Sequence, residues 1–270
     1  MAQSPTQAAL GQRNLIAFNR ALTRWGSRGE LEEEGGAVLC AGGTWIPVVA
    51  NGAYRTDDTV VADELIARAD TFFGSLSRGF TVKVRDTGED DDLRGACEAA
   101  GLERFGTLVP EMIVHAPLRE PAAGDGIALR MVDDEGGLRD FIAVNAEAYG
   151  TYGMPAEVLS DLFDEPAPLL DDPCTHIVVA SRADEPIATA MTYESDGVAS
   201  LQWVGTVPGA RTAGLGALVT VRATNLAFEH GASSCTLQAS PMGEPLYLQL
   251  GYETLYHYGE FVRWPTPPAP

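Results

Sequence analysis

Residues 204–217 combine a strand, a glycine-containing turn and the start of a helix. An apolar strand runs up to the turn signal Pro208-Gly209, and beyond the turn apolar residues recur at helical spacing. The first turn of a helix offers unpaired N–H groups and the positive end of the helix dipole. Gly214 and Gly216 lack the Cβ atoms that would keep a bulky anion away. With the positive charge of Arg211, the segment predicts a phosphate or pyrophosphate cradle.

Two other phosphate-binding loops do not fit these residues. Gly209 to Gly214 has the spacing of a nucleotide-triphosphate loop, but Leu215-Gly216 stand where that loop needs Lys and Ser/Thr. A dinucleotide loop needs a third glycine where this chain has Val219. The remaining pattern, Arg-x-x-Gly-x-Gly over residues 211–216, resembles the acyl-CoA pyrophosphate loop of the GNAT N-acetyltransferase superfamily. An ordinary helix-capping loop is the alternative interpretation.

A second segment carries the same resemblance. Residues 240–253 follow a predicted strand over residues 234–240. They are similar to the second GNAT signature, a short helix with a tyrosine four residues before a Gly-aromatic pair. The resemblance implies that Tyr247 protonates the departing CoA thiolate, and a phenol with an ordinary pKa of about 10 is a proton donor at neutral pH. Ser240 stands where family members often carry Asn. A packed aromatic side chain is the alternative role for Tyr247.

The resemblance also implies a co-substrate, acetyl-CoA or another acyl-CoA, and no metal. The implied CoA contacts are Val204, Thr206, Val207, Arg211, Thr212, Ala213, Gly214, Leu215, Gly216, Ala217, Ser240 and Tyr247. Backbone N–H groups of residues 204–207 are expected to polarise the thioester carbonyl. Tyr149 and Tyr152 fall where family members contact the acceptor. For the general base, Glu194, Glu147 and a chain of water molecules stay open, and either Glu could simply be a surface charge.

From residue 127 onward the predicted elements follow the order β-α-α-β-β-β-α-β-α-β, the succession found in GNAT domains. We therefore predict an α/β fold with a mixed, twisted central sheet flanked by helices. In that family two neighbouring parallel strands, here residues 201–207 and 235–239, splay apart to admit the pantetheine arm. The predicted domains are a catalytic GNAT domain at 127–264, preceded by a linker at 119–126 and followed by a Pro-rich tail at 265–270.

The first half of the chain carries an internal repeat of the second. Residues 79–103 and 231–253 each read as a strand followed by a short helix that ends in Gly. We therefore predict a tandem protein, in which residues 1–118 form a degenerate GNAT-like domain that binds no CoA and shapes the acceptor site or an interface. Cys97 stands where the second copy has Tyr247, and the first copy has no Arg-x-x-Gly-x-Gly.

Other segments of the first half give simpler expectations. Residues 37–40 and 44–49 read as paired strands, and residues 60–73 as an amphipathic helix. Two acidic runs, residues 32–34 and 89–92, are expected to be solvated loops.

Composition excludes several classes of protein. The 270 residues carry a net charge of −20, which argues against nucleic acid as a partner and would steer a cationic acceptor inward. No apolar run approaches the ~20 residues of a membrane helix, and residues 1–14 lack the pattern of a secretory signal. The four cysteines and four histidines form no metal-spaced or disulfide pattern. We therefore expect a cytoplasmic protein without a membrane partner.

Two functions from different classes remain open at this stage. The first is an acyl-CoA-dependent N-acetyltransferase that acts on a small-molecule amine or a protein amine, with O- or S-acyl transfer as a variant of the same chemistry. The second is a non-catalytic acyl-CoA-binding or interaction protein with a GNAT fold. A homodimer is also possible, through an apolar strand edge at residues 255–262.

Overall fold

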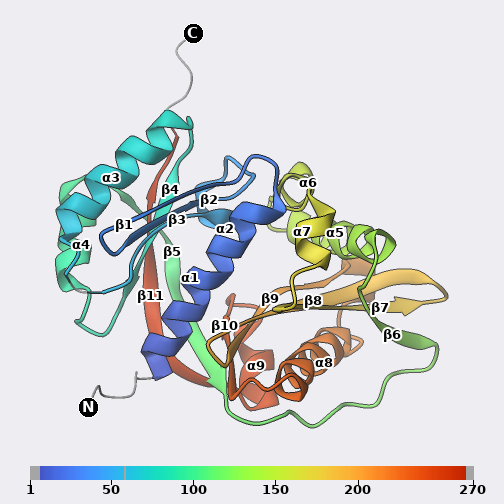
Figure 1. The fold of residues 1–270 in the computed structure, drawn as a ribbon. Helices are drawn as coiled ribbons and strands as arrows, with labels where there is room; N and C mark the ends of the chain where they lie inside the picture. Colours follow the sequence, from blue (N-terminus) through green and yellow to red (C-terminus); the bar gives the residue numbers. More distant parts are fainter. Residues whose placement is uncertain (1–6, 58, 266–270) are drawn as a thin grey trace.

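The computed structural model describes residues 7–57 and 59–265, and most of the predicted Pro-rich tail, residues 266–270, lies outside them. In this part of the chain eleven strands form one sheet in the order β1-β2-β3-β4-β11-β5-β10-β9-β8-β7-β6 (Figure 1). The strands are β1 Glu30–Glu34, β2 Ala37–Ala41, β3 Asn51–Arg55, β4 Phe80–Arg85, β5 Glu103–Val114, β6 Ile127–Met131, β7 Thr175–Arg182, β8 Glu185–Ser195, β9 Val198–Thr206, β10 Ser234–Gln238 and β11 Glu253–Arg263.

Nine α-helices accompany the sheet in the described segments. They are α1 Gln7–Trp25, α2 Pro47–Ala50, α3 Ala62–Ser75, α4 Asp91–Ala99, α5 Glu135–Gly150, α6 Glu157–Leu162, α7 Pro166–Leu170, α8 Leu215–Glu229 and α9 Glu244–Leu250. Alternating side chains of β7 serve two cores: Val178 packs in the core under α8, whereas Ile177 packs in the core under α1 and α5–α7. None of these helices is long and apolar enough to cross a membrane.

The two halves of the chain, residues 7–118 and 119–265, exchange their last strands. β5 leaves the first half and pairs with β10, while β11 leaves the second half and pairs with β4. β5 and β11 also pair with each other, so they lie side by side in the middle of the sheet (Figure 1). Each half therefore completes the sheet of the other, and the division into separate domains stays a prediction.

The helix ends that follow Cys97 and Tyr247 have the same local hydrogen bond. The backbone N–H of Leu102 donates to the carbonyl of Cys97 at 2.9 Å, and that of Tyr252 donates to Tyr247 at 3.0 Å. The same bond also joins Ala232 to Ala227 at the end of α8, so it does not test the predicted equivalence of Cys97 and Tyr247. That the first half is a degenerate copy stays a prediction.

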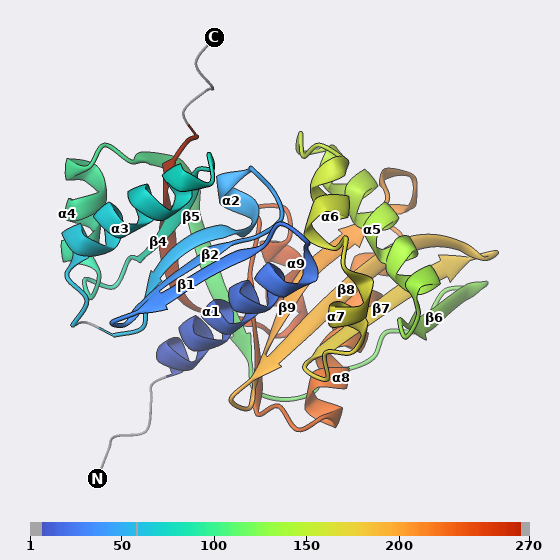
Figure 2. The same ribbon diagram turned by 45° about the horizontal axis from the view of Figure 1, so that its top comes forward.

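Helix α1 packs against both halves of the chain (Figure 2). The sequence analysis does not predict this helix. Its residue Ile16 packs with β2 and β3 of the first half, whereas Phe18 and Trp25 belong to the core of the second half. The side chain of Asn14 donates to the backbone carbonyls of Tyr193 and Val198, at 3.2 and 2.7 Å. The residues that follow β5 are also docked, because the backbone of Leu118 exchanges two hydrogen bonds with the side chain of Asn225.

Three expectations for the first half were wrong. Residues 44–49 are not a strand: α2 begins at Pro47, where the missing N–H of proline costs no helical hydrogen bond, and the strand is β3. The acidic run 32–34 lies in β1, at the edge of the sheet, rather than in a loop. The run 89–92 leads into α4, and its Asp90 is buried among arginines.

The expected dimer edge at residues 255–262 was also wrong. β11 has β4 on one side and β5 on the other, so its backbone N–H and C=O groups are used inside the sheet. A homodimer through another surface stays a prediction.

Asp90 gives the first test of how the first half is held together. Its carboxylate accepts hydrogen bonds from Arg55 at 3.1 Å and from Arg85 at 2.8 Å, and its side chain is 3% exposed. In an Asp90→Asn variant Arg55 and Arg85 each lose one charged partner but keep Asp92 and Glu89, respectively, so we expect the free energy of unfolding to fall by about 1–3 kcal/mol in urea titrations. Asp91→Asn is the control, because Asp91 is 74% exposed; an equal loss in both variants would contradict the prediction.

Candidate active site

The predicted cradle lies between β9 and α8. After β9 the chain makes a short helical turn, and it enters α8 through Gly214, whose φ is +76°. A Cβ atom added at Gly214 would meet no atom within 4 Å, so the space beside the helix start is open. A cavity of about 240 Å³ lies here, lined by Thr206, Ala210, Arg211, Thr212, Gly214, Leu215, Gly216, Ala217 and Leu246. An anion in this cavity would face the first N–H groups of α8.

Arg211 is held in place by the end of helix α5. Its guanidinium donates to the carbonyl of Ala148 at 3.1 Å, to Thr151 Oγ1 at 3.0 Å and to the carbonyl of Thr206 at 3.3 Å. The positive charge therefore also compensates the negative end of the α5 dipole. Arg211 still lines the cradle, as predicted, but as a fixed part of its wall.

β9 and β10 separate next to the cradle, as predicted. Their parallel pairing runs from Val198 opposite Ser234 to Leu201 opposite Leu237, and β9 continues beyond it to Thr206. β9 also carries a bulge against β8, and Trp203 within it has a φ of +50°. A left-handed tryptophan is strained by about 1–3 kcal/mol, a feature that clusters at functional sites.

A cavity of about 540 Å³, here called the gap cavity, lies where these strands part. Val204, Gly205 and Thr206 line it from β9, and Gln238 and Ser240 line it from the β10 side. Arg211, Thr212 and Gly216 line both this cavity and the cradle, so the two form one continuous site. The lining of this site is mixed, with apolar side chains such as Leu246 beside the cation of Arg211.

Tyr247 lies in the wall of the gap cavity. It is 8% exposed, and burial, followed by the nearby Tyr152, raises the pKa of Tyr247 to about 12. The phenol therefore keeps its proton throughout the neutral range. Its ring lies against the backbone of Gly243, where an added Cβ would come within 2.8 Å of Tyr247 Cε2. Gly243 thus leaves the room that positions this ring.

The two predicted acceptor tyrosines have different surroundings. Tyr149 donates to the carbonyl of Val204 at 3.3 Å and lines the gap cavity. Tyr152 is 57% exposed, and its hydroxyl contacts Met242 Sδ at 3.7 Å on the rim of that cavity. Tyr149 therefore lines the interior of the gap cavity, and Tyr152 lies at its solvent-exposed edge.

Some predicted contacts are not brought to the cavities. Val207 packs against the core under α8, and the exposed Ala213 lines none of the cavities. Ser240, in the place of the family Asn, does line the gap cavity, but its hydroxyl already accepts from the N–H of Gly243 at 3.1 Å.

Neither predicted carboxylate lines the cavities. Glu147 is on the exposed side of α5 and lines none of the cavities. Glu194 lies beside His230, at the end of α8 opposite the cradle, and the 15 residues of α8 span about 22 Å. The distance between Glu194 and the cradle cannot be predicted from their spacing in the sequence, because this distance depends on how β8 and α8 pack.

Glu194 belongs instead to a cluster with two histidines. The potential ligand atoms of His176, Glu194 and His230 lie within 4.8 Å of one another, although the two histidines are far apart in the sequence. The two imidazole rings stack at 4.0 Å with an angle of 22° between them, so their in-plane lone pairs run nearly parallel instead of converging. Burial, followed by His230, lowers the pKa of His176 to about 4, and its ring is neutral. We assign this cluster no part in the chemistry of the cavities.

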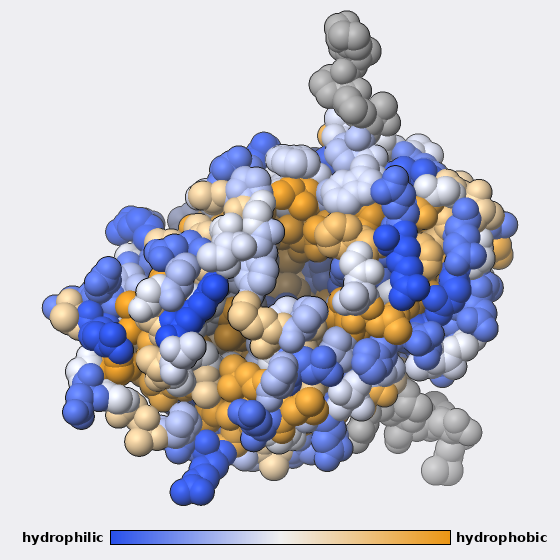
Figure 3. All heavy atoms as spheres, turned by 180° about the vertical axis from the view of Figure 1, so that it is seen from behind, coloured by the Kyte–Doolittle hydropathy of each residue, from blue (hydrophilic) through white to orange (hydrophobic). Residues whose placement is uncertain are grey.

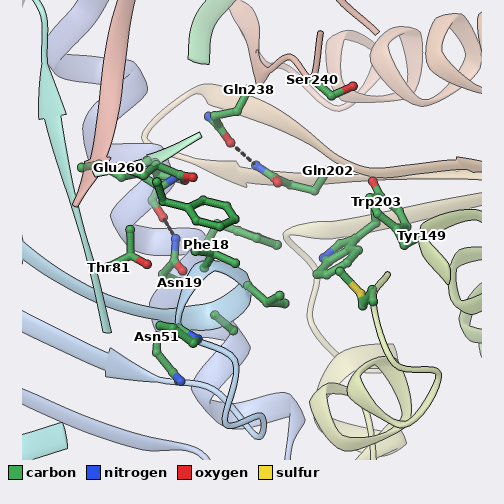
Figure 4. A pocket seen from close by; sticks show the side chains of 18 of the residues that line it. Phe18, Asn19, Asn51, Thr81, Tyr149, Gln202, Trp203, Gln238, Ser240 and Glu260 are labelled. Carbon is green, nitrogen blue, oxygen red and sulfur yellow. Dashed lines mark hydrogen bonds and ion pairs between the residues drawn. The ribbon is translucent and has the colours of Figure 1, made fainter. Parts of the chain in front are cut away.

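A second cavity opens from the gap cavity and was not predicted. Its volume is about 440 Å³, and it shares Tyr149, Gln238 and Ser240 with the gap cavity. We call it the inter-half cavity, because residues from both halves line it (Figure 4). They are Leu15, Phe18, Asn19, Pro47, Val48, Val49, Ala50, Asn51, Tyr54, Thr81, Lys83, Phe105, Tyr149, Met154, Gln202, Trp203, Gln238, Ser240 and Glu260. From behind, the molecule is hollowed near its centre, with apolar side chains around the hollow (Figure 3).

Comparison with known proteins agrees with this geometry. Residues 117–242 match the family model described as an acetyltransferase (GNAT) domain. The second half of the chain is therefore similar to GNAT acetyltransferases. No curated protein matches the chain.

Solved structures extend the GNAT fold to nearly the whole chain. A GCN5-related N-acetyltransferase from Kribbella flavida is 20% identical, with a TM-score of 0.71, and the alignment covers 95% of this chain and 96% of that one. A GCN5-related N-acetyltransferase from Sphaerobacter thermophilus is 16% identical, with a TM-score of 0.58 and coverage of 99% and 96%. A tandem GNAT protein from the clavulanic acid biosynthesis pathway is 13% identical, with a TM-score of 0.61 and 97% coverage of both chains. The predicted GNAT fold is therefore confirmed.

Proposed function

We propose that this protein is an acyl-CoA-dependent N-acyltransferase, with acetyl-CoA as its co-substrate and a small-molecule amine as its acceptor. The observation that carries the proposal is the meeting of two cavities at Tyr149, Gln238 and Ser240. One of them leads from a helix N-terminus past Tyr247, and the other is lined by both halves of the chain. At about 440 Å³ the inter-half cavity suits a small molecule better than a protein segment.

In this proposal each part of the GNAT domain has one task. The first N–H groups of α8 bind the pyrophosphate, and the parted strands hold the pantetheine arm so that the thioester lies near Val204 and Tyr247. Backbone N–H groups of the bulged segment of β9 would polarise the thioester carbonyl.

Direct transfer then needs two bond changes. The neutral amine attacks the thioester carbonyl carbon, so that a C–N bond forms and the C–S bond breaks. Tyr247 gives its proton to the sulfur that leaves. The proton released by the new ammonium passes to water, and water returns a proton to Tyr247. In this route a chain of water molecules acts as the general base. It is one of the three alternatives that the sequence allows, the others being Glu194 and Glu147.

The alternative, a non-catalytic acyl-CoA-binding protein, draws support from one observation. Neither carboxylate proposed as a base lines the cavities. An intact cradle and a buried phenol beside the strand gap favour catalysis more. A cytoplasmic location is part of the proposal.

Two measurements on the full chain separate these functions. Thermal shifts with CoA, acetyl-CoA and longer acyl-CoAs test binding, and thiol release with a panel of primary amines tests transfer. We expect stabilisation by CoA and amine-dependent thiol release. Stabilisation without any amine-dependent release would favour the binding protein, and the absence of both would contradict the proposal.

A further inference from the structure

Three side chains on neighbouring strands form a hydrogen-bonded chain at one end of the inter-half cavity. Gln238 Nε2 on β10 donates to Glu111 Oε2 on β5 at 2.7 Å. Gln202 Nε2 on β9 donates to Gln238 Oε1 at 3.3 Å, as Figure 4 shows. Glu111 is 1% exposed and comes from the first half, on the strand that is exchanged into the second.

The direction of this chain follows from chemistry. When Glu111 is ionised its carboxylate only accepts hydrogen bonds, so Gln238 then turns its NH₂ group to Glu111 and its carbonyl oxygen to Gln202. Gln202 must then use its NH₂ group on Gln238. The carbonyl oxygen of Gln202 is left as the free end, in the wall of the cavity. This end of the cavity therefore offers a hydrogen-bond acceptor.

The far end of the cavity also offers acceptors. Asn19 and Asn51 each donate their NH₂ group to a backbone carbonyl, at 2.9 and 3.0 Å, which leaves their carbonyl oxygens free. Among the described residues, Asn51 Oδ1 and Thr81 Oγ1 are buried without a hydrogen-bond partner, and both residues line the cavity. Figure 4 shows these residues on the side opposite Tyr149 and Trp203. Asn51 Oδ1 can only accept and so calls for a ligand that donates, and the Thr81 hydroxyl beside it can accept from the same ligand.

The charge balance points the same way. Lys83 donates to Glu260 and to the Tyr258 hydroxyl, both at 2.9 Å, so its positive charge is already compensated. Glu111 adds a further acidic group on this face, and the whole chain carries a net charge of −20. A ligand carboxylate would be repelled, whereas a cation or a neutral donor would be accepted.

We propose that the inter-half cavity takes a small acceptor with hydrogen-bond donors at both ends. Its reacting amine donates to Gln202 Oε1, while an ammonium or hydroxyl group at the other end donates to Asn51 and Thr81. Phe18 and Trp203 are apolar parts of the cavity wall. Glu111 is a positioning residue that sets the direction of the amide chain. The identity of the reacting end rests on the proposed function.

Calorimetry on the full chain, saturated with CoA so that no transfer occurs, tests the acceptor class. The probes are straight-chain amines of four to eight carbons that end in an amine, a hydroxyl, a methyl or a carboxylate group. We expect the diamine or amino alcohol of the best length to bind about 10- to 100-fold more tightly than the methyl compound, and the carboxylate compound to bind most weakly. Equal affinities, or a preference for the carboxylate, would overturn the proposal.

Thr81→Val is the matched variant, because it replaces the hydroxyl by a methyl group of similar size. It should reduce the preference for a terminal donor about tenfold while leaving the affinity for the methyl compound unchanged. If the variant kept the full preference for a terminal donor, Thr81 would not bind the far end of the acceptor, and that part of the proposal would be wrong. Transfer is measured separately: selective binding without turnover would support the acceptor class and contradict the proposed function, and turnover without selectivity would do the reverse.

Glu111→Gln tests the near end through a pH profile. Burial raises the pKa of Glu111 to about 7, against the lowering effects of Gln238 and Lys83. The other titratable groups that interact with Glu111 are the phenols of Tyr256 and Tyr258 on β11, while α1 presents Gly11. Below this pKa the carboxyl group carries a proton and can donate, so the direction of the chain is no longer fixed.

The wild type should therefore lose kcat/KM for the amine as pH falls through about 7, beyond the slope caused by protonation of the amine itself. Glu111→Gln should lack this inflection and show about tenfold lower kcat/KM for the amine, with the KM for acetyl-CoA unchanged. The same inflection in both proteins would overturn the positioning role of Glu111.

Discussion

Tyr247→Phe is expected to lower kcat for acyl transfer about 10²- to 10⁴-fold, the range of a positioned general acid. The variant keeps the ring that packs against Gly243 and removes only the hydroxyl, so the affinity for CoA should stay within about twofold of the wild type. Pre-steady-state thiol release gives the rate of the chemical step, and calorimetry with CoA gives the affinity.

The raised pKa of Tyr247, about 12, predicts how this rate depends on pH. The acid form is present below that pKa, so loss of the proton from Tyr247 should not limit the rate up to pH 10. Tyr193→Phe is the matched control, because Tyr193 is a buried tyrosine that lines neither the gap cavity nor the inter-half cavity. If Tyr247→Phe keeps more than a third of the wild-type rate, the proton reaches sulfur by another route.

The cradle and the second half could be predicted because their information is local. Arg211, Gly214 and Gly216 lie within six residues, and the turn and the helix start that position them are encoded in the same segment. Tyr247 lies on a short helix closed by Gly251, whose φ of +102° suits glycine. In motifs of this kind the local sequence determines the backbone conformation that positions the functional residues.

The acceptor side could not be predicted, because it depends on tertiary pairing. Glu111 reaches Gln238 only because β5 crosses into the other half of the sheet. No pattern in residues 103–114 states which strand they will pair with. The strand order instead results from the exchange of β5 and β11 between the two halves. The sequence similarity of the halves does not specify this exchange.

Helix α1 is a different case, because its own residues carry a local signal. Leu15, Phe18, Leu22 and Trp25 recur at spacings of three and four residues, which is typical of an amphipathic helix. All four are buried. This pattern places Asn19 on the same turns as Leu15 and Phe18, but the position of Asn19 over the cavity follows from the packing of α1 against both halves.

Gly214→Glu should abolish most CoA binding, and it tests the cradle more cleanly than a change at Arg211. Replacing Arg211 would also break its hydrogen bonds to the end of α5. An added Cβ at Gly214 meets no atom within 4 Å, so a side chain there starts in the open space that we assign to the pyrophosphate. Two unit charges about 4 Å apart repel by about 4 kcal/mol at an effective dielectric constant of ~20. Solvent at the exposed edge of the cradle screens this repulsion, and we take half of it, about 2 kcal/mol. That energy corresponds to a roughly 30-fold weaker affinity for CoA.

The left-handed backbone of Gly214 adds a cost of about 1–2 kcal/mol for any side chain, so strain must be separated from charge. Gly126→Glu is the matched control: Gly126 also has a positive φ, +72°, an added Cβ there meets no atom within 4 Å, and it lies outside the cavities. Gly214→Ala carries the strain without the charge. We expect calorimetry with CoA to show a large loss only for Gly214→Glu. An equal loss in Gly214→Ala would mean that the backbone conformation, rather than room for the anion, makes the glycine necessary. An unchanged affinity in Gly214→Glu would place CoA elsewhere.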